Sequence, residues 1–492
     1  MTDSNRLRIS AIREATLGVT PATPRMRVGR ITGESLAYAP SFTDSAEIRS
    51  DRMSSDPIPT GQSNAGGIST ELFFPRGRSF NAELFASAFV RDWMRQPEWD
   101  NGEVPASIGA ITATTIAVVD QSGTGGFSGA AIRAGALIRM SGMAQPANNA
   151  VFRVAANAAA TSITIAGGAA ETAPATGRLK QVGFEGASGA ISATVSGLAG
   201  AGIDFTTFGL EVGSWIKIGG PAGGAAAFRF ANAANNGYAR ITAITATAIT
   251  LDNLPAGWAV DAGTGKTIRV FTSDLIRNGT TPIPLTIERS FLGQTTPTHI
   301  VQRGMVAGGL RLDFASERVI GAGFDFAGIA GVDSTAALGS AYVDAPTSGA
   351  MSANVSVGRV SEAGVAVAGP NWVRGATITL NNNLRMKTAL GTLGAVDIGL
   401  GECEVAVTLE TYFGDNALLQ KLANGTPTSI NLRAVQNGQA VFFDVPRMVL
   451  TGGAPSAGGK NADVILPLTG RASFDAAMQA HLLMSRMEYL EA

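Results

Sequence analysis

The stretch Glu402-Cys-Glu-Val-Ala-Val-Thr-Leu409 decides the fold class. From Val405 onward every second residue is large and apolar, and the residues between them are polar or small. The same period of two runs through Leu310 to Phe314 and Leu285 to Glu288. Successive side chains of a β-strand point to opposite faces, so this alternation indicates sheets with one buried and one solvated face. The sequence therefore predicts a mainly β fold across residues 268–492.

Two short segments carry a helical pattern among the strands. Apolar residues recur at helical spacings after Ser79, namely Leu84, Phe85, Ala88, Phe89 and Trp93, and Pro97 is expected to stop that helix. A second helix is predicted from Asp415 to Leu422, with Asn424-Gly425 as its C-terminal cap. The last segment, Ala476 to Leu490, fits either a helix or a strand.

The composition is that of a folded chain with several domains. Hydrophobic residues make up 45% and charged residues 15% of the 492 residues, which is apolar enough for packed cores. The formal net charge of -1 gives no reason to expect a basic surface that wraps nucleic acid. No apolar run reaches the roughly 18 residues of a membrane span, and the first residues lack the apolar run of a signal peptide. We therefore expect no membrane span, and assembly in a cytoplasm.

The middle of the chain contains an internal repeat. Four stretches recur in the same order: Ile111-Thr-Ala-Thr114 as Ile191-Ser-Ala-Thr194, Gly135-Ala-Leu-Ile-Arg-Met-Ser-Gly142 as Gly213-Ser-Trp-Ile-Lys-Ile-Gly-Gly220, Asn148-Asn149 as Asn235-Asn236, and Ser162-Ile-Thr-Ile165 as Ala248-Ile-Thr-Leu251. The offset between the copies grows in one place, the loop Pro221 to Ala234. Because insertions collect in loops, we interpret this pattern as one small β unit, a barrel or sandwich, present twice.

The repeat sets the predicted domain organisation. A discontinuous main domain comprises residues 1–104 and 268–492, and it carries an inserted β module at 105–184 and a second at 185–267. Insertions succeed at exposed loop tips, so the modules are expected to point away from the core of the main domain.

Motifs that would support catalysis are incomplete. Gly263-Thr-Gly-Lys-Thr267 ends like a phosphate-binding loop, but the required glycine five residues before Gly265 is Val260, and a strand-like run follows instead of a helix. Cys403 is the single cysteine and sits in a strand-like run, as a small buried hydrophobe would. With two histidines in the chain, a His-based metal site or triad is hard to build. The sequence predicts no catalytic residue, no cofactor and no metal.

Several motifs resemble the tail tube proteins of long-tailed bacteriophages. They are Arg13-Glu-Ala-Thr-Leu-Gly-Val-Thr-Pro-Ala-Thr-Pro24, Thr32-Gly-Glu-Ser-Leu36, Ser45-Ala-Glu-Ile-Arg-Ser-Asp-Arg52, Ile378-Thr-Leu-Asn-Asn-Asn-Leu-Arg385, Leu409-Glu-Thr-Tyr-Phe-Gly-Asp415 and Val445-Pro-Arg447. No single motif is diagnostic, but their order is specific, and the resemblance covers most of the main domain and at least one repeat.

The resemblance implies a tail-tube β-sandwich or barrel with a flanking helix. Six such subunits form a ring whose inner sheets join into one barrel lumen, and rings stack through an N-terminal arm and long loops. The expected partners are further copies of the chain, a tape measure protein, a tail terminator and baseplate hub proteins. Double-stranded DNA passes through the lumen during genome ejection without sequence-specific binding. The expected location is the virion tail.

Two groups of residues are candidates for these roles. Arg49, Asp51 and Arg52 are predicted inter-ring contacts, because the segments around residues 1–30 and 40–70 are long and irregular for a compact domain. Glu402 and Glu404 are predicted to lie on one strand face that lines the lumen, where negative charge would keep DNA phosphates from binding. Their spacing also suits an acid/base pair. Another β-rich virion protein (baseplate, decoration or adhesin) and a polysaccharide-acting tail enzyme therefore stay as alternatives.

Overall fold

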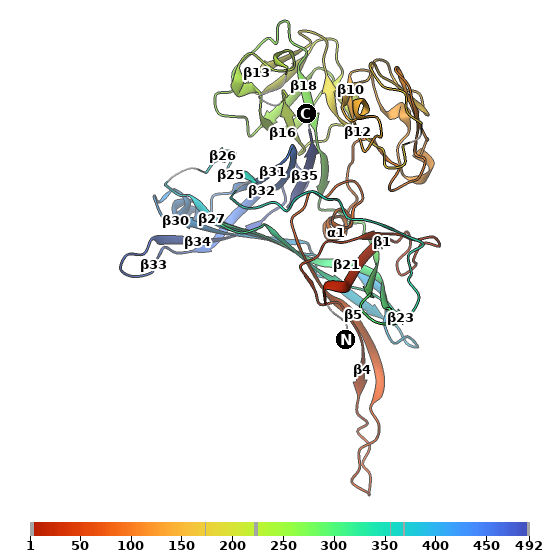
Figure 1. Ribbon diagram of the computed structural model, residues 1–492. Coiled ribbons are helices and arrows are strands. Elements are labelled where there is room, and N and C mark those ends of the chain that lie inside the picture. Colours follow the sequence, from red (N-terminus) through yellow and green to blue (C-terminus); the bar gives the residue numbers. More distant parts are fainter. Residues whose placement is uncertain (1–3, 173, 221–224, 355, 368–369, 490–492) are drawn as a thin grey trace.

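The computed structural model describes residues 4–172, 174–220, 225–354, 356–367 and 370–489. Within these ranges the fold is mainly β, as the sequence predicts, with two α-helices, α1 (Phe80–Phe89) and α2 (Ala417–Asn424). Figure 1 shows three parts: a curled sheet in the middle, a group of smaller sheets above it, and a long hairpin below it. Pro221 to Gly224 in the predicted insertion loop, and Leu490 at the end of the chain, lie outside the described residues.

The front sheet is defined by six antiparallel strands. In spatial order these are β5 (Ile58–Glu71), β22 (Gly321–Ala327), β21 (Thr298–Ala315), β27 (Val373–Asn381), β30 (Glu404–Tyr412) and β34 (Val464–Ala472). The alternation in the sequence correctly identifies β30 and its neighbours: Val405, Val407 and Leu409 are buried, and Glu404, Ala406 and Thr408 are exposed.

A back sheet lies behind the front sheet. Its strands are β25 (Val357–Glu362), β31 (Thr428–Gln436), β32 (Gln439–Gly453), β35 (Leu483–Glu488) and β19 (Asp274–Arg277). Strand β32 joins the two sheets, because its second half pairs with β34 and its first half pairs with β35. The segment that fitted either helix or strand therefore contains a strand, β35.

The remaining strands of the main domain extend these sheets. One group surrounds the N-terminal strand and consists of β1 (Leu7–Arg13), β2 (Arg25–Val28), β20 (Leu285–Phe291), β23 (Ala330–Ser334) and β24 (Ala341–Val343). The other strands are short or peripheral: β3 (Gly33–Glu34), β4 (Ala37–Thr43), β26 (Val365–Ala366), β28 (Arg385–Thr388), β29 (Ala395–Gly399) and β33 (Ser456–Ala457). The expectation of an irregular segment at 1–30 is wrong for Leu7–Arg13, which pairs with β20 along its whole length and is partly buried. Hydrogen bonding to β20 holds this segment in an extended strand, which the local sequence does not predict.

Helix α1 fills the space between the two sheets. All ten of its residues are buried. The ring of Phe85 lies 5.1 Å from that of Phe324 on the front sheet and 6.3 Å from that of Phe443 on the back sheet. Phe443 also meets Phe314 of the front sheet, with ring centroids 5.7 Å apart. The helix is therefore part of the sandwich core and not only a flank of it.

The extent predicted for this first helix is wrong. Helix α1 ends at Phe89 because Val90 adopts a left-handed conformation, with φ 53°, and its N–H bonds back to the last turn. Trp93 therefore lies beyond the helix, yet its indole donates a 2.9 Å hydrogen bond to the carbonyl oxygen of Ala82. The second helix, α2, begins two residues later than predicted and ends at the predicted cap, since Gly425 is left-handed with φ 59°.

The module strands, β7 to β18, form the group above the main sheets (Figure 1). Six come from the first repeat, β7 (Ile108–Ile111), β8 (Thr115–Val118), β9 (Ala136–Ser141), β10 (Val151–Arg153), β11 (Ser162–Thr164) and β12 (Arg178–Glu185), and five from the second, β13 (Ile191–Thr194), β14 (Gly197–Gly200), β15 (Trp215–Ile218), β16 (Tyr238–Ile244) and β17 (Ala248–Asp252). Strand β18 (Arg269–Thr272) lies just past the predicted boundary at residue 267 and pairs with β15. Strand β12 pairs with β18, so one sheet runs through both repeats. Gly183 permits this approach, because a Cβ there would lie 2.2 Å from the carbonyl oxygen of Val270.

The two repeats make equivalent hydrogen bonds. In the first, the side-chain amide of Asn148 exchanges two hydrogen bonds with the backbone of Ala169, at 3.0 and 2.9 Å. In the second, Asn235 does the same with Ala259, at 2.8 and 3.0 Å. Both asparagines are fully buried, where an unmade hydrogen bond would be costly. Asn148 and Asn235, which mark the predicted repeat in the sequence, thus hold loops in place in the same way.

The aromatic contact between the sheets makes a testable prediction. Phe443→Ala should lower the free energy of unfolding by about 3–5 kcal/mol, because it opens a cavity between α1 and both sheets. Phe474→Ala is the matched control, since Phe474 is 60% exposed and should change the stability little. Denaturant unfolding of the unassembled subunit measures both, and equal losses in the two variants would contradict this account of the core.

Candidate assembly surfaces and module junction

The arm, residues 37–65, is the hairpin of β4 and the first half of β5. It projects from the body of the molecule, and its tip is the farthest point from the module strands (Figure 1). Arg49 and Asp51 lie at this tip and form a 2.6 Å ion pair, while Arg52 next to them has a positive φ of 61°. The three residues predicted as inter-ring contacts are neighbours in the sequence, and the structure places them at the end of this projection.

Large apolar side chains on the arm were missed by the sequence reasoning. Ile48 is 102% exposed and Met53 69% exposed, and Phe42 and Ile58 nearer the base are also exposed. Isolated exposed apolar residues are common, but several on one projecting hairpin indicate a surface that another molecule covers. The sequence does show Ile48 and Met53 on either side of the charged residues. Their exposure, however, follows only from the projection of the hairpin away from the body of the molecule.

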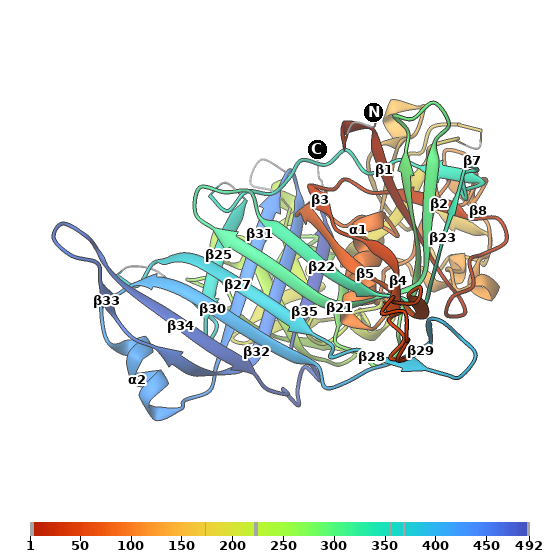
Figure 2. The same ribbon diagram turned by 90° about the horizontal axis from the view of Figure 1, so that it is seen from below.

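The front face is the side of the front sheet that faces away from α1. Figure 2 shows it from below, with β21, β27, β30 and β34 running across it uncovered. The registers place small and polar residues side by side: Asp313, Thr377, Thr408 and Thr469 form one cross-strand row, and Arg311, Thr379, Ala406 and Arg471 form the next. Such a face offers hydroxyl and carboxylate groups to solvent over the width of four strands.

The arginines of the front face lie in ion pairs. Arg471 lies 3.1 Å from Glu404 and 3.9 Å from Glu402, so the two predicted lumen carboxylates meet at one guanidinium. Glu402 precedes the strand instead of lying on it, because β30 begins at Glu404. Arg311 pairs with Asp313 at 2.7 Å and Arg374 with Glu410 at 3.3 Å.

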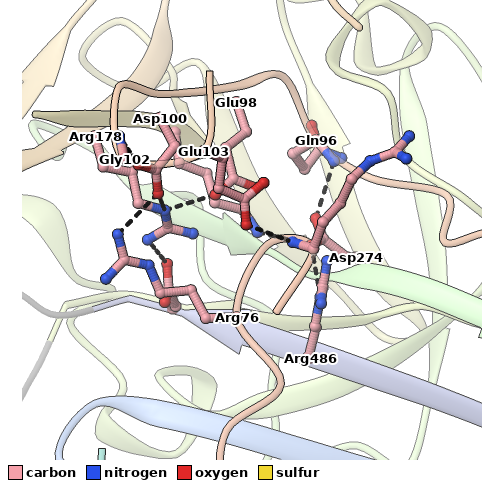
Figure 3. A network of polar contacts seen from close by, with 12 residues as sticks. Arg76, Gln96, Glu98, Asp100, Gly102, Glu103, Arg178, Asp274 and Arg486 are labelled. Carbon is pink, nitrogen blue, oxygen red and sulfur yellow. Dashed lines mark hydrogen bonds and ion pairs between the residues drawn. The ribbon is translucent and has the colours of Figure 1, made fainter. Parts of the chain in front are cut away.

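The module junction joins the module strands to the back sheet through buried charges (Figure 3). Asp274 of β19 accepts from Lys180 of β12 at 2.7 Å and from Arg486 of β35 at 2.9 Å. Arg178 of β12 contacts Glu98 and Glu488, each at 2.6 Å. Burial would raise the pKa of Glu98, but Arg178 and Lys180 hold it well below its usual range. Separating these groups would leave unpaired charges buried in the protein, which is costly. The ion pairs therefore hold the module strands and the back sheet together.

A second contact at the junction is aromatic. Trp215 of β15 stacks on Phe442 of β32, with ring centroids 4.5 Å apart and planes 7° apart. The indole of Trp215 also donates a 2.7 Å hydrogen bond to Asp444, which Arg240 approaches at 3.4 Å. The modules protrude from the main domain, yet their base is packed against the back sheet and is not a flexible tether.

The motifs tested for chemistry take structural roles. After Gly263 to Thr267 the chain enters strand β18, and the Lys266 ammonium donates to the carbonyl oxygen of Ala226 at 3.2 Å. Burial raises the pKa of the half-buried Cys403 thiol to about 11, which disfavours the thiolate needed for nucleophilic attack. In the described ranges no group of three or more His, Cys, Asp or Glu is placed to hold a metal ion. No described helix has the length and apolar character to cross a bilayer.

Asp444 makes the junction sensitive to pH. Burial raises its pKa from 3.8 to about 6 despite Arg240, so the folded state favours the protonated carboxyl. This contribution to stability is fully present below pH 3.8 and is lost as pH rises through about 6. Relative to Asp444→Asn, the wild-type protein should therefore lose up to about 3 kcal/mol of unfolding free energy between these values.

Unfolding free energies measured from pH 3.5 to 7 test this prediction. The change with pH carries the result, because the lost hydrogen bonds of the Asn variant add only a constant offset. Asp333→Asn, at an exposed position on β23, is the control and should follow the wild-type curve. A difference between wild type and Asp444→Asn that does not vary with pH would contradict the assignment.

Comparison with known proteins adds the family. A family model described as phage tail tube protein matches the chain in two segments, residues 4–272 and 248–472. No curated protein sequence matches the chain. Because the matched segments cover more than half of its length, the chain belongs to the phage tail tube protein family.

Proposed function

We propose that this chain is the structural subunit of a tail tube, built from stacked hexameric rings around a lumen that conducts the genome during ejection. The observation that carries the proposal is the uncovered polar front face on the side of the sandwich opposite the module junction. Six copies around an axis would turn this face inward and the modules outward. The number six comes from the family resemblance, and closed rings are the usual result of such repeated contacts.

The arm supplies the contact between rings in this proposal. It projects beyond the body of the subunit, and its tip combines the Arg49–Asp51 ion pair with exposed Ile48 and Met53. An adjacent ring that covered these apolar side chains would gain on the order of 1.5–3 kcal/mol for each one fully buried. Arg49, Asp51 and Arg52 then set the direction of the contact through their charges.

The modules are two copies of one β unit inserted in the tail tube domain. We place the boundaries at 105–184 and 185–267, within a tail-tube β-sandwich formed by 1–104 and 268–492. The matching hydrogen bonds of Asn148 and Asn235 support the duplication. The junction at Asp274 and Asp444 supports a rigid orientation of both copies on the outer wall of the tube.

The proposed role is structural and not enzymatic. Its partners are further copies of the chain, the tape measure protein, the tail terminator and the baseplate hub, with double-stranded DNA in transit. Assembly takes place in the host cytoplasm and the product resides in the virion tail. The high thiol pKa of Cys403 and the pairing of Glu402 and Glu404 with Arg471 both disfavour an acid/base or nucleophilic role.

Negative-stain microscopy of the purified protein tests ring stacking. Wild type should form tubes, or rings with a central hole. The double variant Ile48→Asp/Met53→Asp should form rings but few or short tubes, because charge replaces the apolar contact. Val260→Asp, at an exposed module position, should leave tube length unchanged. A wild-type protein that stays monomeric under all conditions, or arm variants with normal tubes, would contradict the proposal.

Epitope insertion tests which side faces outward. A short epitope after Val195, which is 82% exposed on the second module, should bind antibody along the whole length of intact tubes. The same epitope after Gly401, beside Glu402, should be reached only after the tubes are dissociated. Labelling of intact tubes through the Gly401 insertion would show that the front face does not line the lumen.

A further inference from the structure

The front face contains arginines, which a surface that must not hold DNA would be expected to lack. Besides Arg303, which donates a 3.2 Å hydrogen bond to the Thr20 hydroxyl, its strands carry three arginines: Arg311 on β21, Arg374 on β27 and Arg471 on β34. Free arginines bind phosphate, and each phosphate contact strengthens nucleic-acid binding in a salt-dependent way. A tube wall with three free guanidinium groups per subunit would therefore retain DNA.

Each of these three arginines lies within ion-pair distance of a carboxylate on the same face. Asp313 is two residues from Arg311 on the same strand, and its Oδ1, which pairs with the Arg311 guanidinium at 2.7 Å, also accepts from the Thr377 hydroxyl at 2.9 Å. Glu410 reaches Arg374 from the adjacent strand β30. Glu404, with Glu402 farther off, reaches Arg471 across the β30–β34 ladder. The same arrangement thus occurs on three different strands.

Stability does not explain these pairs. The side chains of all three arginines and their partners are between 45% and 75% exposed, and pairs this exposed contribute about 0–1 kcal/mol. Their electrostatic effect on a passing polyanion is larger, because the carboxylate neutralises the guanidinium beside it and repels an approaching phosphate. Glu71 and Asp325, on the outer strands of the same sheet, add further negative charge.

We propose that Asp313, Glu404 and Glu410 keep the front face from binding DNA by holding its three arginines in ion pairs, with Glu402 as a second partner of Arg471. The proposal rests on the proposed function, since it assumes that DNA passes this face. This role differs from that of a surface that is acidic throughout. Each carboxylate neutralises one particular arginine, and the arginines in turn limit the repulsion between the carboxylates.

The test uses the full-length unassembled subunit, in which the front face is open to solvent, and a short double-stranded DNA. The quadruple variant Asp313→Asn/Glu402→Gln/Glu404→Gln/Glu410→Gln should retard the DNA in a mobility-shift assay at low salt, whereas wild type should not. The binding constant should fall as the salt concentration rises. A plot of its logarithm against the logarithm of the salt concentration should have a slope of up to about 3 in magnitude, for three phosphate contacts per subunit.

Two control variants separate the ion pairs from net charge. Asp120→Asn/Asp204→Asn/Asp333→Asn/Asp397→Asn removes four negative charges, none of them on a strand of the front sheet, and should not bind DNA. Three of the positions are exposed, and the fourth, Asp397, is half-exposed and pairs with Lys387. Adding Arg311→Gln, Arg374→Gln and Arg471→Gln to the quadruple variant should abolish the retention. DNA binding by wild type, no binding by the quadruple variant, or equal binding by the charge-matched control would each overturn the proposal.

Microscopy of the same preparations distinguishes this inference from the proposed function. Tubes that form normally from the quadruple variant while the subunit gains DNA binding support both ideas. Failure of wild type to form rings or tubes, together with the predicted gain of DNA binding, would reject the tube and leave only the effect of the ion pairs on DNA binding standing.

Discussion

A carboxylate without access to water, Asp274, holds the two parts of this subunit together. Lys180 comes to it from the module strands and Arg486 from the last strand of the chain. Burying such charges is costly, so their presence requires all partners to be in place at once. Three strands therefore fold together: β35 at the C-terminus, β19 where the chain returns from the modules, and β12 at the end of the first repeat. Arg486 also donates to the carbonyl oxygen of Pro75 and covers the ring of Trp93, which ties the same point to the region of α1.

This constraint gives the molecule its layers. The modules rest on the back sheet, α1 and its phenylalanines fill the centre, and the front sheet is left with one face uncovered. A subunit that only needed solubility would not combine a broad open sheet with a projecting hairpin that carries exposed apolar residues. The proposed tube gives both features a common purpose, since a tube needs an inner wall and contacts between successive rings.

The front face shows how exposed ion pairs can matter while adding little stability. Pairs such as Arg471–Glu404 are solvated, and their contribution to the unfolding free energy is small. Their position on a continuous sheet face, in register across four strands, determines how that face presents charge to a large polyanion. The threonine row beside them presents hydroxyl groups in place of basic side chains. In the proposed role of the front face, function depends on which charges are neighbours, and not on the total charge of the chain.

The sequence by itself determined the β class, the alternation of strands such as β30 and the second helix with its Gly425 cap, and it predicted the repeat marked by its asparagine pairs. These features are local, and period-two patterns, turn residues and caps act over a few residues. Tertiary structure decided the rest. Val90 ends α1 earlier than its apolar spacing suggested, Leu7–Arg13 becomes a strand only beside β20, and Glu402 and Glu404 acquire their meaning from Arg471, which lies on another strand. The junction was hidden for the same reason: Lys180, Asp274 and Arg486 are far apart in the chain, and no local pattern records that the folded sheets bring them together.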